Sequence, residues 1–171
     1  MKPNIFLVGM MAAGKSTVGR RLALELELDF FDTDQIVEER AGADIPWIFD
    51  VEGEKGFRDR EQKVVDEFSH RKGIVLATGG GVILRPVNRE NLAVGGTIVY
   101  LNASLDRLLE RTQNEEKRPL LMGGNTEERL RDLLEERKEL YKQIADIEVF
   151  VGKATAKSLT KEIVRKLEMM T

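Results

Sequence analysis

The feature that most constrains this chain is a glycine-bounded turn between a short apolar run and an amphipathic segment. The turn has Gly9, four further residues, and then Gly14, Lys15 and Ser16. The run NIFLVG before it predicts a buried strand, and residues 15–28 after it predict a helix. Glycines at these positions let the backbone turn tightly, so that successive N–H groups point at one anion. A strand, such a turn and a helix together predict a phosphate-binding loop rather than an accidental match to the spacing.

The predicted loop also carries the side chains that nucleotide chemistry needs. Lys15 would reach the β- and γ-phosphates, Ser16 would place its hydroxyl on Mg²⁺, and Thr17 would contact the α-phosphate. The loop residues expected at the nucleotide are Ala12, Ala13, Gly14, Lys15, Ser16 and Thr17. The sequence therefore predicts a site for a nucleotide triphosphate group and its magnesium ion.

The rest of the chain alternates short apolar runs with charge-rich amphipathic segments. Strands are predicted at NIFLVG, LDFFDTD, GIVLAT, GTIVYLN and IEVFV, and helices at 15–28, 35–41, 45–51, 55–71, 86–93, 105–112, 127–144 and 156–169. Because the strands are apolar throughout, they predict a parallel sheet with helices on both faces. The length of 171 residues fits one α/β domain.

Composition narrows the classes of partner. The formal net charge is −3, without the basic excess of a general nucleic-acid or membrane-surface binder. The chain has no cysteine, which excludes disulfides and zinc–cysteine sites. No apolar run is long enough to span a membrane. We therefore expect a monomeric cytoplasmic protein that acts on small molecules and has no nucleic-acid or membrane partner.

Two acidic residues end the segment LDFFDTD. Asp32 and Asp34 are two residues apart, and in extended backbone such residues face the same way. Ligands of open α/β sheets bind at the carboxyl ends of strands, where a carboxylate would help to hold Mg²⁺. We therefore expect both acids in one crevice. The alternative for either acid alone is that it caps the following helix.

Two arginines lie at positions that the helical pattern predicts to be buried. Arg137 falls within the apolar stripe of residues 130–141, and Arg58 lies at the edge of the stripe of residues 57–68. A buried guanidinium is costly unless an anion pairs with it. Together they predict a fork for a carboxylate or phosphate of the substrate. The alternatives are an internal carboxylate partner for either, or solvation for Arg58.

Three further features carry candidate site residues. The triplet Gly79, Gly80 and Gly81 follows a predicted strand, and its missing side chains would let a ligand approach the backbone. The polar segment 112–125 is a long loop in a compact domain, and such loops are often functional. Its Arg118 would close over the γ-phosphate and stabilise transition-state charge. Arg111 is a second candidate for the nucleotide side.

These residues resemble the shikimate kinase family over nearly the whole chain. The motifs that carry the resemblance are GMMAAGKST, FFDTD, IFDVEGEKGFRDRE, LATGGGVI, RPLL and ERKELY. The resemblance implies a P-loop kinase fold with a five-stranded parallel sheet, a lid at about 112–125 and a helical substrate-binding region at about 34–62. It also implies transfer of a phosphoryl group from ATP to shikimate, a step toward chorismate and the aromatic amino acids.

The resemblance further implies a role for each matching residue. Arg58, Gly80 and Arg137 would bind shikimate, and Asp34 would bind its ring hydroxyls and help to deprotonate the attacking one. Lys15 and Arg118 would stabilise the transferring phosphoryl group. Ser16, with Asp32 through water, would hold Mg²⁺. The glycines flanking Gly80 would also line the shikimate pocket.

Two departures from the family pattern stand out. Many relatives have glycine where this chain has Ala12, and relatives often have arginine in the loop after the last strand, where this chain has Lys153. Two alternative functions remain: a related kinase of the same fold, such as a gluconate kinase, and a regulatory nucleotide-binding module without catalysis. The two arginines with the glycine triplet argue against the first. The presence of Lys15, Asp34 and Arg118 argues against the second.

Overall fold

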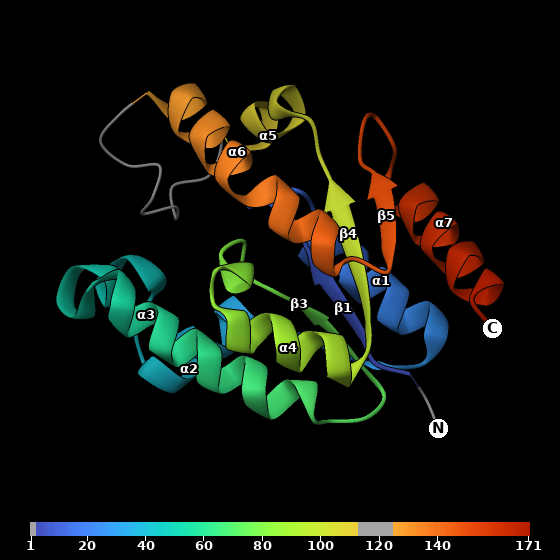
Figure 1. Ribbon diagram of the computed structural model, residues 1–171, viewed down its shortest axis with the longest axis horizontal. Helices are drawn as coiled ribbons and strands as arrows, with labels where there is room; N and C mark the ends of the chain where they lie inside the picture. The colour runs from blue at the N-terminus through green and yellow to red at the C-terminus, as the bar shows by residue number, and fades with distance from the viewer. Residues whose placement is uncertain (1–2, 113–124) are drawn as a thin grey trace.

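The computed structural model describes residues 3–112 and 125–171. Within these residues, five parallel strands form one sheet in the order β2-β3-β1-β4-β5. The strands are β1 (Ile5–Val8), β2 (Asp29–Asp32), β3 (Ile74–Ala77), β4 (Thr97–Asn102) and β5 (Ile147–Phe150). The predicted all-parallel α/β sheet is therefore confirmed, and all five predicted strands are present (Figure 1).

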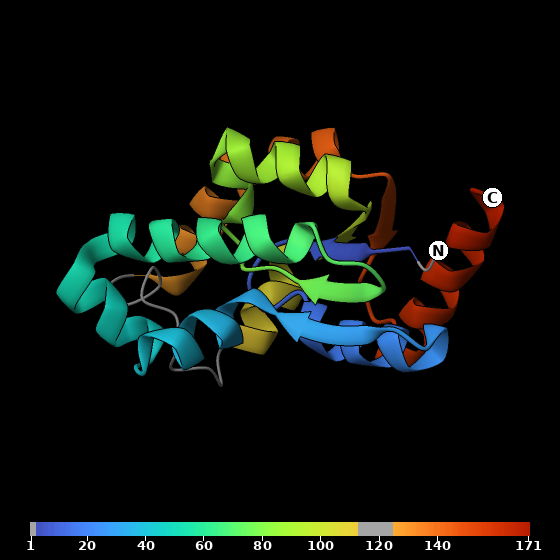
Figure 2. The same ribbon diagram turned by 90° about the horizontal axis from the view of Figure 1, so that it is seen from below.

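Helices cover both faces of the sheet. They are α1 (Lys15–Leu26), α2 (Thr33–Ala41), α3 (Ile45–Ser69), α4 (Pro86–Gly95), α5 (Leu105–Thr112), α6 (Thr126–Ile144) and α7 (Ala156–Met169), with a short 3₁₀ turn at Val82–Leu84. Helices α1 and α7 pack together on one face, and α3, α4 and α6 lie on the other (Figures 1 and 2). All residues of β1 and β3 are buried, as expected for strands covered on both sides.

The strand register brings the candidate motifs together at one edge of the sheet. Leu7 of β1 pairs with Ala77 of β3, and Ala77 also pairs with Asp32 of β2. Because these strands are parallel, the loop after β1, the end of β2 and the glycine triplet after β3 all leave the same edge. Helix α2 and the first part of α3 rise on one side of this edge, and α5 and the start of α6 rise on the other (Figure 1).

Two details of the helices differ from the sequence predictions. Helix α2 begins at Thr33 rather than at residue 35, so Asp34 lies in the first helical turn and not in extended backbone. The predicted helices 45–51 and 55–71 form one element, α3, with a kink at Gly53, whose φ is 75°. No helix among residues 3–112 and 125–171 is long and apolar enough to cross a membrane.

Candidate active site

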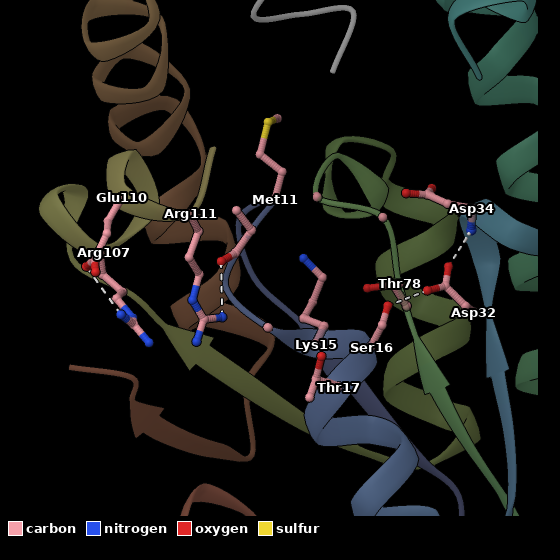
Figure 3. Close-up of a pocket in the computed structure, with 14 residues that line it drawn as sticks. Met11, Lys15, Ser16, Thr17, Asp32, Asp34, Thr78, Arg107, Glu110 and Arg111 are labelled. Atoms are coloured by element: carbon pink, nitrogen blue, oxygen red, sulfur yellow. Dashed lines mark hydrogen bonds and ion pairs between the residues drawn. The ribbon is translucent and has the colours of Figure 1, made fainter. Parts of the chain in front are cut away.

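A cleft of about 510 Å³ opens at this edge of the sheet (Figure 3). Its lining residues are Met11, Ala12, Gly14, Lys15, Ser16, Thr17, Asp32, Asp34, Thr78, Gly79, Gly80, Arg107, Glu110 and Arg111. Ten of these were predicted as site residues from the sequence; Met11, Thr78, Arg107 and Glu110 were not. The structure thus brings the phosphate loop, both acids and two glycines of the triplet to one cavity.

The phosphate loop leaves the first turn of α1 open to the cleft. Gly14 caps the helix with a φ of 97° and offers no side-chain oxygen to the N–H groups that follow. These N–H groups and the positive end of the helix dipole therefore stay available to an anion. The Lys15 ammonium donates to the carbonyls of Gly9 at 2.6 Å and Met10 at 2.8 Å, which holds the cation within the loop.

Asp32 has two structural roles at the end of β2. Its Oδ1 accepts hydrogen bonds from the N–H groups of Asp34 at 2.9 Å and Gln35 at 3.3 Å, so Asp32 caps α2. Its Oδ2 accepts a hydrogen bond from the Ser16 hydroxyl at 2.5 Å. The capping alternative is therefore confirmed for Asp32, and the second carboxylate oxygen still faces the phosphate loop (Figure 3). Capping also turns Asp34 into the cleft, because the helix begins there.

The glycine triplet packs directly against carboxyl and guanidinium side chains. A Cβ atom on Gly79 would lie 2.7 Å from Asp34 Oδ1 and 2.8 Å from Glu61 Oε2. A Cβ on Gly80 would lie 3.4 Å from Arg137 Nη1, and one on Gly81 would overlap the Arg58 guanidinium. The triplet is therefore more than a flexible turn, since its missing side chains make room for two carboxyl groups and two guanidinium groups around one short loop.

The two predicted arginines are buried, as the helical pattern indicated. Arg58 is 7% exposed and Arg137 is 2% exposed. Arg58 donates to Glu61 Oε1 at 3.0 Å and lies 3.4 Å from Glu54. Among the described residues, Nε and Nη1 of Arg137 have no hydrogen-bond partner. Arg58 therefore has the internal carboxylate partner that was one alternative, whereas Arg137 keeps donors free beside Gly80.

Glu61 is a site residue that the sequence analysis missed. Its side chain is 1% exposed, and its Oε2 has no hydrogen-bond partner among the described residues. Burial raises the pKa of the Glu61 carboxyl, and the charges of Arg58, Arg137 and Arg85 oppose this shift. The buried cluster thus holds two guanidinium groups and one carboxyl group, with the carboxyl groups of Glu54 and Asp34 at its edge. The unused donors of Arg137 are the part of it that an anionic ligand would satisfy.

The far side of the phosphate loop is formed by α5. Arg111 Nη1 donates to the Ala12 carbonyl at 3.3 Å, and Arg107 lies 3.2 Å from Glu110 (Figure 3). Arg111 therefore lies at the loop, as predicted. Ala13 does not line the cleft, since it is 1% exposed and packs in the core. The predicted lid and its Arg118 lie outside the described residues, apart from the two end positions of the segment.

Comparisons with known proteins agree with this geometry. The family model for shikimate kinase matches residues 11–168. A shikimate kinase of Legionella pneumophila (strain Corby) is 54% identical over 164 residues, which cover 96% of this chain and 94% of that protein. A solved structure of shikimate kinase from Acinetobacter baumannii in complex with shikimate has a TM-score of 0.98 and 45% identity, and the match covers 100% of this chain and 96% of that one.

More distant structures share the fold alone. A gluconokinase from Sinorhizobium meliloti has a TM-score of 0.62 at 16% identity. The gap between this value and the 0.98 of the Acinetobacter baumannii enzyme separates a shared architecture from a shared family. The chain therefore belongs to the shikimate kinase family, and it is an ATP-dependent kinase.

Proposed function

We propose that the chain transfers the γ-phosphoryl group of ATP to the 3-hydroxyl of shikimate, giving ADP and shikimate 3-phosphate. The observation that carries the proposal is the cluster of buried guanidinium groups beside the glycine triplet, in contact with the cleft that holds the phosphate loop. Free donors on Arg137 require an anion there, and the carboxylate of shikimate supplies one. The proposed enzyme is a cytoplasmic monomer, since a small acidic domain with its own core needs no partner.

In this proposal the acceptor binds between the glycine triplet and the region of residues 34–62. Arg58 and Arg137 bind the carboxylate, and the N–H groups of the triplet lie against it. Asp34 lines the same cleft and accepts hydrogen bonds from the ring hydroxyls. Asp34 and Asp32 are the carboxyl groups of the cleft lining next to the glycine triplet and the phosphate loop, and Asp32 already accepts a hydrogen bond from Ser16. Asp34 is therefore the group that accepts the proton of the attacking hydroxyl in this proposal.

The nucleotide occupies the other half of the cleft. The open N–H groups at the start of α1 bind the phosphates, Thr17 contacts the α-phosphate, and Arg111 lies on the opposite wall. Lys15 exchanges its loop carbonyls for phosphate oxygens and stabilises the charge of the transferring group, together with Arg118. Such transfer depends mainly on positioning and charge neutralisation, so Asp34 does not have to be a strong base.

Ser16 and Asp32 are suited to hold Mg²⁺ with the phosphates. Both present hard oxygen ligands, and the 2.5 Å contact between them places these oxygens at one point of the cleft wall. No group of three or more metal-binding side chains occurs in residues 3–112 and 125–171. In nucleotide sites Mg²⁺ keeps water and phosphate ligands and takes few from the protein. When bound, the ion would neutralise charge on the phosphates.

An ADP-release assay with ATP and Mg²⁺ tests the proposal directly. The acceptors are shikimate, gluconate and a panel of nucleoside monophosphates, each supplied alone. We expect ADP release that depends on shikimate. Release with gluconate instead would preserve the phosphate site and refute the acceptor assignment. ATP binding without release in any mixture would support the non-catalytic alternative.

A further inference from the structure

Tyr141 makes a contact at the acceptor site that no assigned role explains. It lies in α6, one helical turn after Arg137, and its side chain is fully buried. Its hydroxyl donates a hydrogen bond to the carbonyl of Gly80, although 61 positions separate the two residues in the chain. The hydroxyl also lies 3.9 Å from the sulfur of Met10, at the start of the phosphate loop. A core tyrosine thus reaches the backbone of the glycine triplet.

The hydroxyl can act here only as a neutral hydrogen-bonding group. Burial raises the pKa of the Tyr141 phenol, and the positive charges of Arg137 and Arg58 oppose the shift without cancelling it. The proton therefore stays on the oxygen across the working pH range and remains available to the Gly80 carbonyl. The hydroxyl therefore holds the Gly80 carbonyl through a hydrogen bond and does not supply a proton to the reaction.

The Tyr141 hydrogen bond fixes the Gly80–Gly81 peptide unit, which borders the proposed acceptor site. A trans peptide unit is planar, with its C=O and N–H on opposite sides. When Tyr141 holds the Gly80 carbonyl, it also fixes the direction of the Gly81 N–H. Among the described residues, neither the Gly80 N–H nor the Gly81 N–H donates a hydrogen bond, whereas the Gly79 N–H donates to Thr33. The same two glycines lie against the guanidinium groups of Arg137 and Arg58.

We propose that Tyr141 is a positioning residue for the acceptor, which sets the Gly80–Gly81 peptide and the Arg137 guanidinium in register with each other. Arg137 and Tyr141 share one helix face, and Arg137 Nη1 lies over Gly80, so the helix and the loop are joined at both residues. A carboxylate that binds both the Arg137 guanidinium and the backbone N–H groups of the triplet needs these donors at a fixed distance from each other. The inference rests on the proposed function, in which Arg137 binds the carboxylate of shikimate.

The ring and the hydroxyl of Tyr141 make separate contacts, so one can be removed without the other. The ring stacks on Tyr100 with a centroid distance of 5.0 Å, and both side chains are buried. The Tyr100 hydroxyl makes no hydrogen bond within the described residues. Tyr100→Phe therefore removes a hydroxyl from the same stacked pair without touching the glycine triplet. It is the matched control for Tyr141→Phe, which keeps the ring and removes the hydrogen bond to the Gly80 carbonyl.

The test is steady-state kinetics of the whole enzyme with each substrate varied in turn, supported by thermal melting of both variants. We expect Tyr141→Phe to raise the KM for shikimate about tenfold, because a buried carbonyl loses its donor and the carboxylate site loses register. The KM for ATP should change less than about twofold, and Tyr100→Phe should leave both KM values unchanged. A calorimetric titration with shikimate should show the same loss of affinity.

The outcomes separate this inference from the function on which it rests. Normal wild-type kinetics with an unchanged shikimate KM in Tyr141→Phe would overturn the positioning role alone. An equal rise in Tyr100→Phe would also overturn it, because the effect would then come from packing. A wild-type enzyme that releases no ADP with shikimate would overturn the proposed function and this inference together.

Discussion

Replacing Arg137 with methionine separates ligand binding from folding. Methionine has a long unbranched side chain, so Arg137→Met removes the charge and fills most of the buried space. In the free enzyme, Arg137 is 2% exposed and two of its nitrogens lack a hydrogen-bond partner among the described residues. A buried cation in this state contributes little to stability, and replacing it with an apolar group is often neutral or stabilising. We expect the melting temperature of free Arg137→Met to equal or exceed that of the wild type.

The two unpaired Arg137 donors set the expected loss of shikimate binding free energy. Hydrogen bonds to a charged group contribute about 1.5–3 kcal/mol each. Two donors from Arg137 would contribute about 3–6 kcal/mol, but Arg58 remains beside the site and retains part of the attraction. We therefore take the low end, about 3 kcal/mol, which corresponds to a shikimate KM about 100-fold higher. The KM for ATP should stay near the wild-type value, since the phosphate loop does not contact Arg137 through an ion pair.

Coupled kinetics and thermal melting together test this reasoning. Shikimate at 100 times its wild-type dissociation constant should stabilise the wild type by about 2.7 kcal/mol. At the same concentration it should stabilise Arg137→Met by only about 0.4 kcal/mol, because binding to the variant is about 100-fold weaker. Arg137→Lys is the control that keeps the charge without the planar fork, and its KM should lie between the other two. An unchanged shikimate KM would refute the binding role. A large fall in the melting temperature of the free variant would refute the view that Arg137 lacks an internal partner.

Three further predictions concern the phosphate loop and Glu61. Lys15→Ala should lower kcat by about three orders of magnitude in the ADP-release assay, and retained turnover would show that the loop is misread. Ala12 has a φ of 65°, so Ala12→Gly should raise the free energy of unfolding in urea by about 0.5–1 kcal/mol, whereas Ala13→Gly should lower it. Burial raises the pKa of Glu61 in the native state above its ordinary value of about 4.5. Between these two pKa values the native state binds more protons than the unfolded state, so the free energy of unfolding of the wild type falls as the pH rises. The melting temperature of Glu61→Gln should therefore rise relative to that of the wild type as the pH increases from 4 to 7. A constant difference between the two melting temperatures over this range would contradict the prediction.

The parts of the site that the sequence predicted are those that local patterns encode. The phosphate loop follows from the spacing of Gly9, Gly14 and Lys15 between a strand and a helix, because the glycines and the helix start create the binding geometry themselves. The burial of Arg137 follows from the helical period, which places it among apolar neighbours. The parallel sheet follows from the largely apolar runs between the helices, and the structure confirms all five strands; the edge strands β2 and β5 also carry acidic residues.

The parts that the sequence did not predict depend on contacts between distant segments. The Tyr141 hydroxyl reaches Gly80 because α6 crosses the loop after β3, and no local pattern encodes that crossing. Arg107 and Glu110 line the cleft because of where α5 lies. Glu61 did have a local signal, since it stands three residues after Arg58 on the same helix, where opposite charges pair. Asp34 reaches the cleft from a helical turn and not from extended backbone, so its predicted place was right and the reason given for it was wrong.

Several departures from ordinary folding rules lie at the cleft. Away from it, Asp44, Asn125 and Thr155 each cap a helix with a side-chain oxygen. At the cleft, α1 starts without a side-chain cap, Ala12 adopts a left-handed conformation, and Arg137 is buried with unused donors. Each departure costs stability in the free enzyme. The uncapped N–H groups of α1 would be satisfied by phosphate and the unused Arg137 donors by a carboxylate, whereas the cost at Ala12 is steric. A cleft with one such anion site at the phosphate loop, a second beside its Gly80, and Asp34 in its lining is the arrangement that a phosphoryl transfer to an anionic acceptor requires.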